Sequence, residues 1–112
     1  MIQGGDVLTK ATADPHALKL QDLVERVLSG PGMLDPDVRR AIAEDTEVVE
    51  PLAGYVDKVA RHAHQITDSD VEELGRAGYS EDQVLEATIS AALGAGVRRL
   101  ETGLDALRVA RP

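Results

Sequence analysis

The sequence predicts an all-α fold, a bundle of five to six helices in a single domain over residues 1–112. Helix start and stop residues recur along the chain, and apolar residues between them repeat at helical spacing. No run alternates apolar and polar residues in the way that a half-buried strand would. The length of 112 residues suits one domain, since single domains cluster near ~100–150 residues.

Proline and glycine divide the first half of the chain. Asp6 is expected to cap a short helix over 7–13, with residues 1–14 frayed, and Asp14-Pro15 predicts the start of a longer one. That longer helix has one apolar stripe and ends at Gly30-Pro31-Gly32. The stripe consists of Leu20, Leu23, Val24, Val27 and Leu28.

Asp35-Pro36 repeats the same start signal and predicts a short helix over 36–44. Three of its apolar residues are expected to point inward, namely Val38, Ala41 and Ile42. The acidic segment 44–50 reads as a loop, because Pro51 is a plausible first residue of the next helix.

Three further helices are predicted in the second half, over 51–65, from Thr67 to Gly78, and over 81–109. The first buries one face, and in the second Val71 and Leu74 are expected to face inward. Ser80 and Gln83 form a capping box that opens the last helix. The buried face of the first comprises Leu52, Tyr55, Val56, Val59, Ala63 and Ile66.

The helix over 81–109 has two unlike faces. One is a bulky stripe expected in the core, made of Leu85, Ile89, Leu93, Leu100, Leu104 and Leu107. The other is small and neutral, made of Ala87, Thr88, Ala91, Gly94, Ala95 and Thr102. Small residues let helix backbones approach closely, so we interpret this face as a second packing face. Its partner is a helix of the same chain or of a neighbouring subunit; the alternative is an exposed helix rich in alanine for its helix propensity.

The composition favours sharing apolar surface with another copy. Hydrophobic residues make up 43% of the chain, yet Tyr55 and Tyr79 are its only aromatic residues. Large aromatic side chains dominate the energetics of small cores. We therefore predict a homo-oligomer that associates through the small-residue face of the 81–109 helix.

Charge and cysteine content exclude several functions. A net charge of −8 argues against a nucleic-acid partner, which requires a basic surface. The chain has no cysteine, which removes disulfides and thiolate sites. The longest apolar run, 91–97, is much shorter than the ~20 residues that cross a bilayer. The N-terminal residues show no signal peptide, so the expectation is a cytoplasmic protein without a membrane partner.

The segment from Leu52 to Leu107 resembles the carboxymuconolactone decarboxylase-like, or alkylhydroperoxidase D-like, family. The resemblance lies in Ile66-Thr-Asp-x-Asp-Val-x-x-Leu74, in Ala77-Gly-Tyr-Ser-Glu-Asp-Gln-Val84 and in the Ala-Ala-Leu…Arg-Arg-Leu pattern up to Leu100. It implies an all-helical fold that assembles into homodimers, trimers or hexamers.

Redox members of that family carry Cys-x-x-Cys followed by His, and this chain has no cysteine at all. Hydroperoxide reduction by that mechanism is excluded, because the thiolate is its nucleophile. We expect a non-redox, homo-oligomeric protein that binds a small ligand or serves in assembly, with no cofactor. The alternative is a cysteine-free acid–base enzyme acting on a lactone or a small carboxylic acid.

The candidate catalytic residues of that alternative are His62 as base, Tyr55 as proton donor or orienting group, and Arg98 as a clamp for a carboxylate. His62 and His64 are two apart on the predicted helix, so they point about 200° apart and cannot share a metal. The alternative for His62 is a boundary histidine that satisfies a local hydrogen bond.

Arg98 and Arg99 interrupt an otherwise small and apolar helix. A guanidinium there requires a carboxylate or an anionic ligand, since an unpaired buried charge is costly. We favour a structural or intersubunit ion pair, with Glu86, Glu101 or the acidic loop as partner, over a clamp for a small acidic ligand. The acidic residues of 44–50 are interpreted as a solvated loop rather than a metal site.

Overall fold

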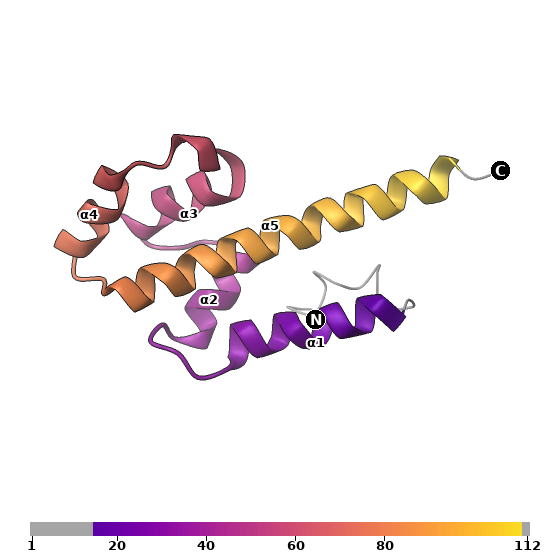
Figure 1. Ribbon diagram of the computed structural model, residues 1–112, viewed down its shortest axis with the longest axis horizontal. Coiled ribbons are helices and arrows are strands. Elements are labelled where there is room, and N and C mark those ends of the chain that lie inside the picture. The colour runs from indigo at the N-terminus through magenta and orange to yellow at the C-terminus, as the bar shows by residue number, and fades with distance from the viewer. Residues whose placement is uncertain (1–14, 111–112) are drawn as a thin grey trace.

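The computed structural model describes residues 15–110 and contains five α-helices within that range (Figure 1). No strand occurs among these residues, so the predicted all-α class is confirmed. The elements are α1 (Pro15–Ser29), α2 (Pro36–Ala43), α3 (Leu52–Arg61), the 3₁₀ turn η2 (Ala63–Gln65), α4 (Asp68–Arg76) and α5 (Glu81–Ala110). The helix predicted over 7–13 and the cap at Asp14 lie outside the described residues.

Helix α5 is the axis of the molecule. It runs nearly the full length, with α3 and α4 on one side and α1 and α2 on the other (Figure 1). The molecule measures 53 × 29 × 23 Å, because the C-terminal part of α5 extends beyond the other helices. None of the described helices has the length and apolarity that crossing a membrane would need.

The small-residue face of α5 packs inside the same chain. Ala87, Ala91 and Ala95 are 0%, 2% and 4% exposed. A Cβ placed on Gly94 would overlap the carbonyl oxygen of Ala43 at the end of α2, which shows how closely the two helices approach. The predicted second packing face is therefore buried by helices of the same chain, although Thr102 at its far end is exposed.

Two predictions about α5 are corrected by this packing. Leu85, Ile89, Leu100 and Leu107 are exposed, not core, because the close α2–α5 approach leaves room only for small side chains on the inner face. The other two bulky residues, Leu93 and Leu104, are half-buried. Because the inner face is already covered, its alanines are not available to a second subunit, so a homo-oligomer needs a different surface.

The core forms two apolar clusters of aliphatic residues and one tyrosine. The larger, between α2, α3, α4 and α5, contains Leu34, Ile42, Leu52, Tyr55, Val56, Leu74, Val84, Ala87 and Ala91. The smaller, beside α1, contains Val24, Leu28, Ala43 and Val97. Val71, which was predicted to face inward, is 41% exposed, and Leu23 of the predicted apolar stripe is 51% exposed.

The helix-capping roles predicted for Asp35, Ser80 and Gly78 are confirmed. Asp35 accepts a hydrogen bond from the backbone N–H of Asp37 at 2.9 Å at the start of α2. Ser80 and Gln83 exchange side-chain and backbone hydrogen bonds of 2.9 and 3.1 Å at the start of α5. Gly78 has a φ of +104°, the left-handed conformation predicted for the residue that ends α4.

Helix α3 is shorter than predicted. It begins at Leu52, ends at Arg61 and is followed by His62 in a non-helical conformation, so the expected helix over 51–65 is wrong at its C-terminal end. The chain turns here through η2, which allows Ile66 to pack against the larger cluster before α4 begins.

A polar contact fixes the loop between α1 and α2. Arg39, only 3% exposed, donates to the carbonyl oxygens of Val27, Gly30 and Leu34 at 2.6–3.1 Å. The Glu86 carboxylate of α5 accepts the backbone N–H groups of Met33 and Leu34 at 2.7–2.9 Å. These backbone hydrogen bonds lower the pKa of Glu86. Backbone groups in and beside the loop are thus hydrogen-bonded to side chains of α2 and α5.

Candidate functional site

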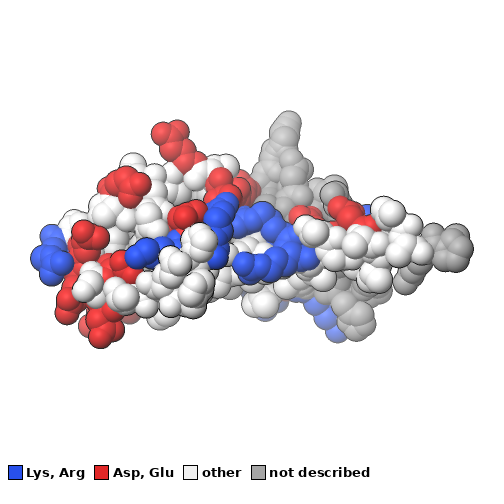
Figure 2. Space-filling model, turned by 90° about the horizontal axis from the view of Figure 1, so that it is seen from above, with Lys and Arg blue, Asp and Glu red and all other residues white. Residues whose placement is uncertain are grey.

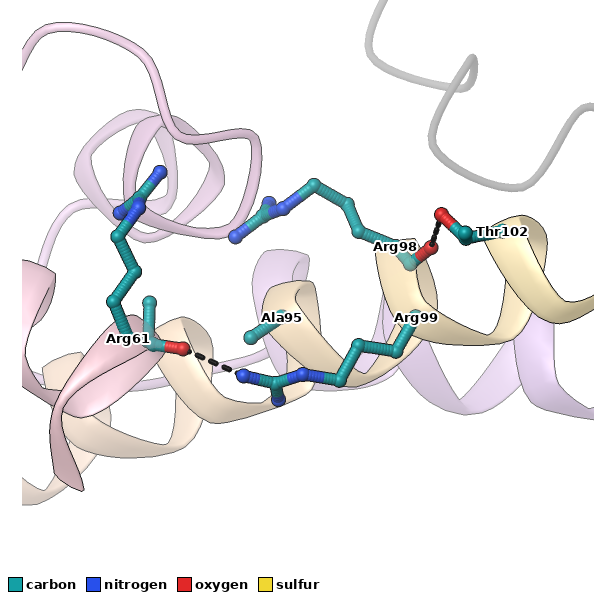
Figure 3. Close-up of a pocket in the computed structure, with 6 residues that line it drawn as sticks. Arg61, Ala95, Arg98, Arg99 and Thr102 are labelled. Carbon is teal, nitrogen blue, oxygen red and sulfur yellow. Dashed lines mark hydrogen bonds between the residues drawn. The ribbon is translucent and has the colours of Figure 1, made fainter. Parts of the chain in front are cut away.

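A surface pocket of about 320 Å³ lies where the end of α3 meets the middle of α5 (Figure 3). Its floor is apolar and small, and its sides are cationic (Figure 3). It is lined by Ala60, Arg61, Ala95, Arg98, Arg99 and Thr102. The pocket exists because α3 ends at Arg61 and does not continue across α5.

Arg98 and Arg99 join α5 to the ends of two other helices. The Nη1 group of Arg98 donates to the carbonyl oxygen of Ala43 at 2.6 Å, at the last residue of α2. The Nη2 group of Arg99 donates to the carbonyl oxygen of Ala60 at 2.8 Å, in the last turn of α3 (Figure 3). Cations are favoured at helix C-termini, where backbone carbonyl groups lack helical partners. Both arginines therefore have a structural role.

The predicted ion pair of these arginines is not formed within residues 15–110. Neither guanidinium pairs with a carboxylate there, since each donates to a backbone carbonyl instead. Glu86, one of the expected partners, is bound to the loop before α2. A guanidinium carries five N–H donors. Arg98 and Arg99 thus retain donors and full positive charge at the pocket.

Arg61 is the third arginine that lines the pocket, but carboxylates of the chain already balance its charge. It forms ion pairs with Asp57 at 2.7 Å and with Asp45. The hydrogen bond to Asp45 is the main reason that the pKa of Arg61 is raised. Asp45 belongs to the acidic loop, so this interaction ties part of that loop to α3. The charge available to a ligand consequently comes from Arg98 and Arg99.

Positive charge is concentrated around the pocket, although the protein as a whole is acidic. The whole chain carries a net charge of −8. Figure 2 shows a group of Lys and Arg side chains in the middle of one face, while Asp and Glu dominate its end near α4. The pocket therefore places positive charge on an otherwise acidic molecule.

The residues predicted for acid–base catalysis lie apart. Arg98 lines the arginine pocket, whereas Tyr55 lines a second pocket of about 350 Å³ between α3 and α4. The Tyr55 hydroxyl lies 2.7 Å from the Thr88 oxygen. Thr88 uses its hydrogen on the Val84 carbonyl at 2.7 Å, so Tyr55 is the donor. His62 lines neither pocket.

His62 and His64 are both exposed at the turn after α3. Their ring centroids are 6.4 Å apart with an angle of 71° between the planes. Within the described residues, no group of three His, Asp, Glu or Cys side chains is arranged to hold a metal ion. An exposed His62 with no catalytic neighbour gives little support to the acid–base enzyme.

Sequence reasoning selected Arg98 but missed the pocket around it. Arg61 was not singled out because its position depends on where α3 ends, which local sequence did not show. The sequence does contain one indication of where Arg61 lies. Asp57 and Arg61 are spaced i, i+4, which places Arg61 on a polar face of the helix. Thr102 was assigned to the packing face, but its hydroxyl lies at the pocket edge and donates to the carbonyl of Arg98 at 3.0 Å.

The fold and this site together define an all-α protein with an arginine-lined surface pocket. No protein-family model, curated protein or solved structure matches the chain. The resemblance to the alkylhydroperoxidase D-like family therefore stays a prediction.

Proposed function

We propose that the protein binds a small carboxylate or phosphate compound in the arginine pocket, as a non-redox, homo-oligomeric binding or assembly protein. The observation that carries the proposal is the pair Arg98 and Arg99, which line a pocket without a carboxylate partner among the described residues. A bound anionic ligand provides the negative charge that the sequence analysis expected from a carboxylate of the chain.

The pocket suits such a ligand in size and in preorganisation. About 320 Å³ is at the lower end of the range for small-molecule sites. The hydrogen bonds to Ala43 and Ala60 hold both guanidinium groups in place before a ligand arrives. Preorganised donors lose little conformational entropy on binding, and guanidinium groups recognise carboxylate and phosphate through two parallel hydrogen bonds.

The absence of cysteine makes thiol-based turnover impossible in this chain. A binding role also agrees with an exposed His62 and with a Tyr55 hydroxyl that donates to Thr88 rather than to an open cavity. The enzyme acting on a lactone or small acid remains the weaker candidate.

The experiment is titration calorimetry at low ionic strength with inorganic phosphate, succinate and acetate as probes. We expect phosphate or succinate to bind in the micromolar to millimolar range and acetate to bind more weakly. The double variant Arg98→Gln/Arg99→Gln should weaken binding at least tenfold, since two charge-assisted hydrogen-bond donors are lost. Arg99→Lys, which keeps the charge but not the paired donors, should fall between the two.

The matched control is Arg76→Gln, which removes an exposed arginine in the last turn of α4, outside the residues that line the pocket. This control should bind the probes as the unaltered protein does. Circular dichroism of each variant without ligand shows whether loss of the carbonyl contacts unfolds α2 or α3. Binding of none of the three probes at millimolar concentration, or equal binding by the folded double variant, would contradict the proposal.

A further inference from the structure

The outward face of α5 is an exposed apolar stripe of seven residues, which we call the outer stripe. Its leucines and isoleucine are 40–57% exposed, and its alanine and two glycines are exposed as well. Such a continuous apolar surface is informative where isolated exposed apolar residues are not. The outer stripe consists of Leu85, Ile89, Ala92, Gly96, Leu100, Gly103 and Leu107.

The spacing of these residues keeps them in line along the helix. Successive members are separated by 4, 3, 4, 4, 3 and 4 positions. This is an 11-residue repeat used twice, and 11 residues complete three helical turns at 3.67 residues per turn, close to the 3.6 of a straight α-helix. The stripe therefore stays on one side of α5 over its ~33 Å from Leu85 to Leu107.

Two glycines lie within this stripe although the chain itself does not require them. A Cβ on Gly96 or Gly103 would meet no atom within 4 Å, so no contact inside the molecule excludes a side chain there. Glycine in a helix interior is unfavourable relative to alanine. Small residues on an exposed helix face are what a closely approaching second helix needs, as Gly94 illustrates on the inner face against α2.

The stripe matches itself when a second copy runs antiparallel. The spacing reads the same in both directions from Gly96, so a two-fold axis beside Gly96 aligns the two stripes. In that arrangement Ile89 faces Gly103 of the second copy, and Ala92 faces its Leu100. Large residues then meet small ones at these positions, and Leu85 meets Leu107 at each end, whereas a parallel pair would set each leucine against itself and leave gaps at each glycine.

Charge selects the same orientation. The first turn of α5 is acidic, with Glu81 and Asp82, whereas Arg108 in its last turn pairs with Asp105 of the same helix at 2.9 Å. An antiparallel pair keeps the two acidic starts apart and opposes the two helix dipoles. A parallel pair would bring the two acidic starts together.

We propose that α5 pairs with α5 of a second copy of this chain, antiparallel through the outer stripe, around a two-fold axis beside Gly96. The interface is separate from the arginine pocket, which uses Ala95, Arg98, Arg99 and Thr102 on a neighbouring face of the helix. The proposal therefore stands or falls independently of ligand binding.

The first test is the mass of the full chain by light scattering or sedimentation at micromolar concentration, compared with its monomer mass of 11.9 kDa. We expect twice that mass. Gly96→Leu should give monomers, because its side chain fills the space at the axis without a clash inside the monomer. The control Gly75→Leu, at an equally open glycine of α4, should remain dimeric.

The orientation is tested by single cysteines, which a cysteine-free chain accommodates without background. Under mild oxidation Gly96→Cys should link to itself, and Leu85→Cys should link only when mixed with Leu107→Cys. A monomer at high concentration would overturn the proposal. So would a larger assembly that survives Gly96→Leu, or self-linking of Leu85→Cys in place of Gly96→Cys.

Discussion

Gly94 decides how closely α2 and α5 pack, and it gives the sharpest prediction at the scale of one residue. Gly94→Ala should destabilise the fold by ~2–3 kcal/mol, because the added methyl overlaps the Ala43 carbonyl and forces two backbones apart. Chemical denaturation measures the change in the free energy of unfolding. Gly75→Ala is the matched control, since its methyl meets open space and alanine is the better helix former. An equal effect of the two substitutions would show that the approach of α2 does not depend on Gly94.

Glu86 predicts a specific dependence of stability on pH. Backbone N–H groups of Met33, then of Leu34, lower its pKa below the ordinary value of 4.5. A group whose pKa is lowered by folding stabilises the protein above its unfolded pKa, and the contribution is lost as pH falls through the folded value. The unaltered protein should therefore lose stability progressively as pH falls below 4.5, because Glu86 of the unfolded chain binds a proton before Glu86 of the folded protein does.

Glu86→Gln should remove that part of the acid dependence. At neutral pH the variant should be less stable by on the order of 1 kcal/mol, because a neutral amide replaces a carboxylate that accepts charge-assisted bonds. Its stability should then change less than that of the unaltered protein between neutral pH and pH 4. Urea midpoints at both pH values give the comparison, with Glu72→Gln, exposed on α4, as control. Identical acid dependence in all three proteins would exclude Glu86 as a source.

Among the elements, the connection between α1 and α2 depends on one buried side chain. Arg39→Met should cost ~3 kcal/mol, since methionine replaces the apolar stem but leaves three carbonyl oxygens, one at the end of α1 and two in the loop, without their charged donor. The neighbouring Arg40 pairs with Glu25 at 3.1 Å near the surface. Arg40→Met should therefore cost no more than ~1 kcal/mol. Thermal melts of both variants test the difference, and similar losses would show that the loop is held by other contacts.

Helix ends were predictable from sequence where the capping side chain lies beside the backbone that it caps. Asp35, Ser80 and Gly78 act within their own turn, so a few residues of sequence contain the whole interaction. The C-terminal end of α3 was not predictable in this way. It depends on Ile66 reaching the core, which is a property of the assembled helices.

The sequence also did not predict correctly which face of α5 is buried. Hydrophobicity favours the leucine-rich side, yet the inner side is chosen by how closely α2 can approach Gly94. Arg39 was missed for a related reason, because an arginine becomes buried only when loop carbonyls gather around it. The arginine pocket likewise requires Arg61 and Arg98, far apart in sequence, to meet at one crossing.

At the scale of the whole molecule, shape favours the association of two copies and net charge opposes it. The projecting part of α5 offers apolar area for pairing, while two copies with a charge of −8 each repel one another. Arg108 in the last turn of α5 is already paired with Asp105, so net repulsion between the two copies dominates the long-range electrostatics of the dimer. Apolar burial itself changes little with simple salt.

The two proposed associations should consequently respond to salt in opposite directions. Raising sodium chloride from about 0.01 M to about 1 M shortens the Debye length from ~30 Å to ~3 Å. The dimer should tighten several-fold, because the repulsion between acidic copies is screened. Phosphate binding at Arg98 and Arg99 should weaken by at least tenfold, because its attraction is screened in the same way. Sedimentation and calorimetry across one salt series measure both. A dimer that dissociates as salt rises would show that ionic contacts, and not the outer stripe, hold the copies together.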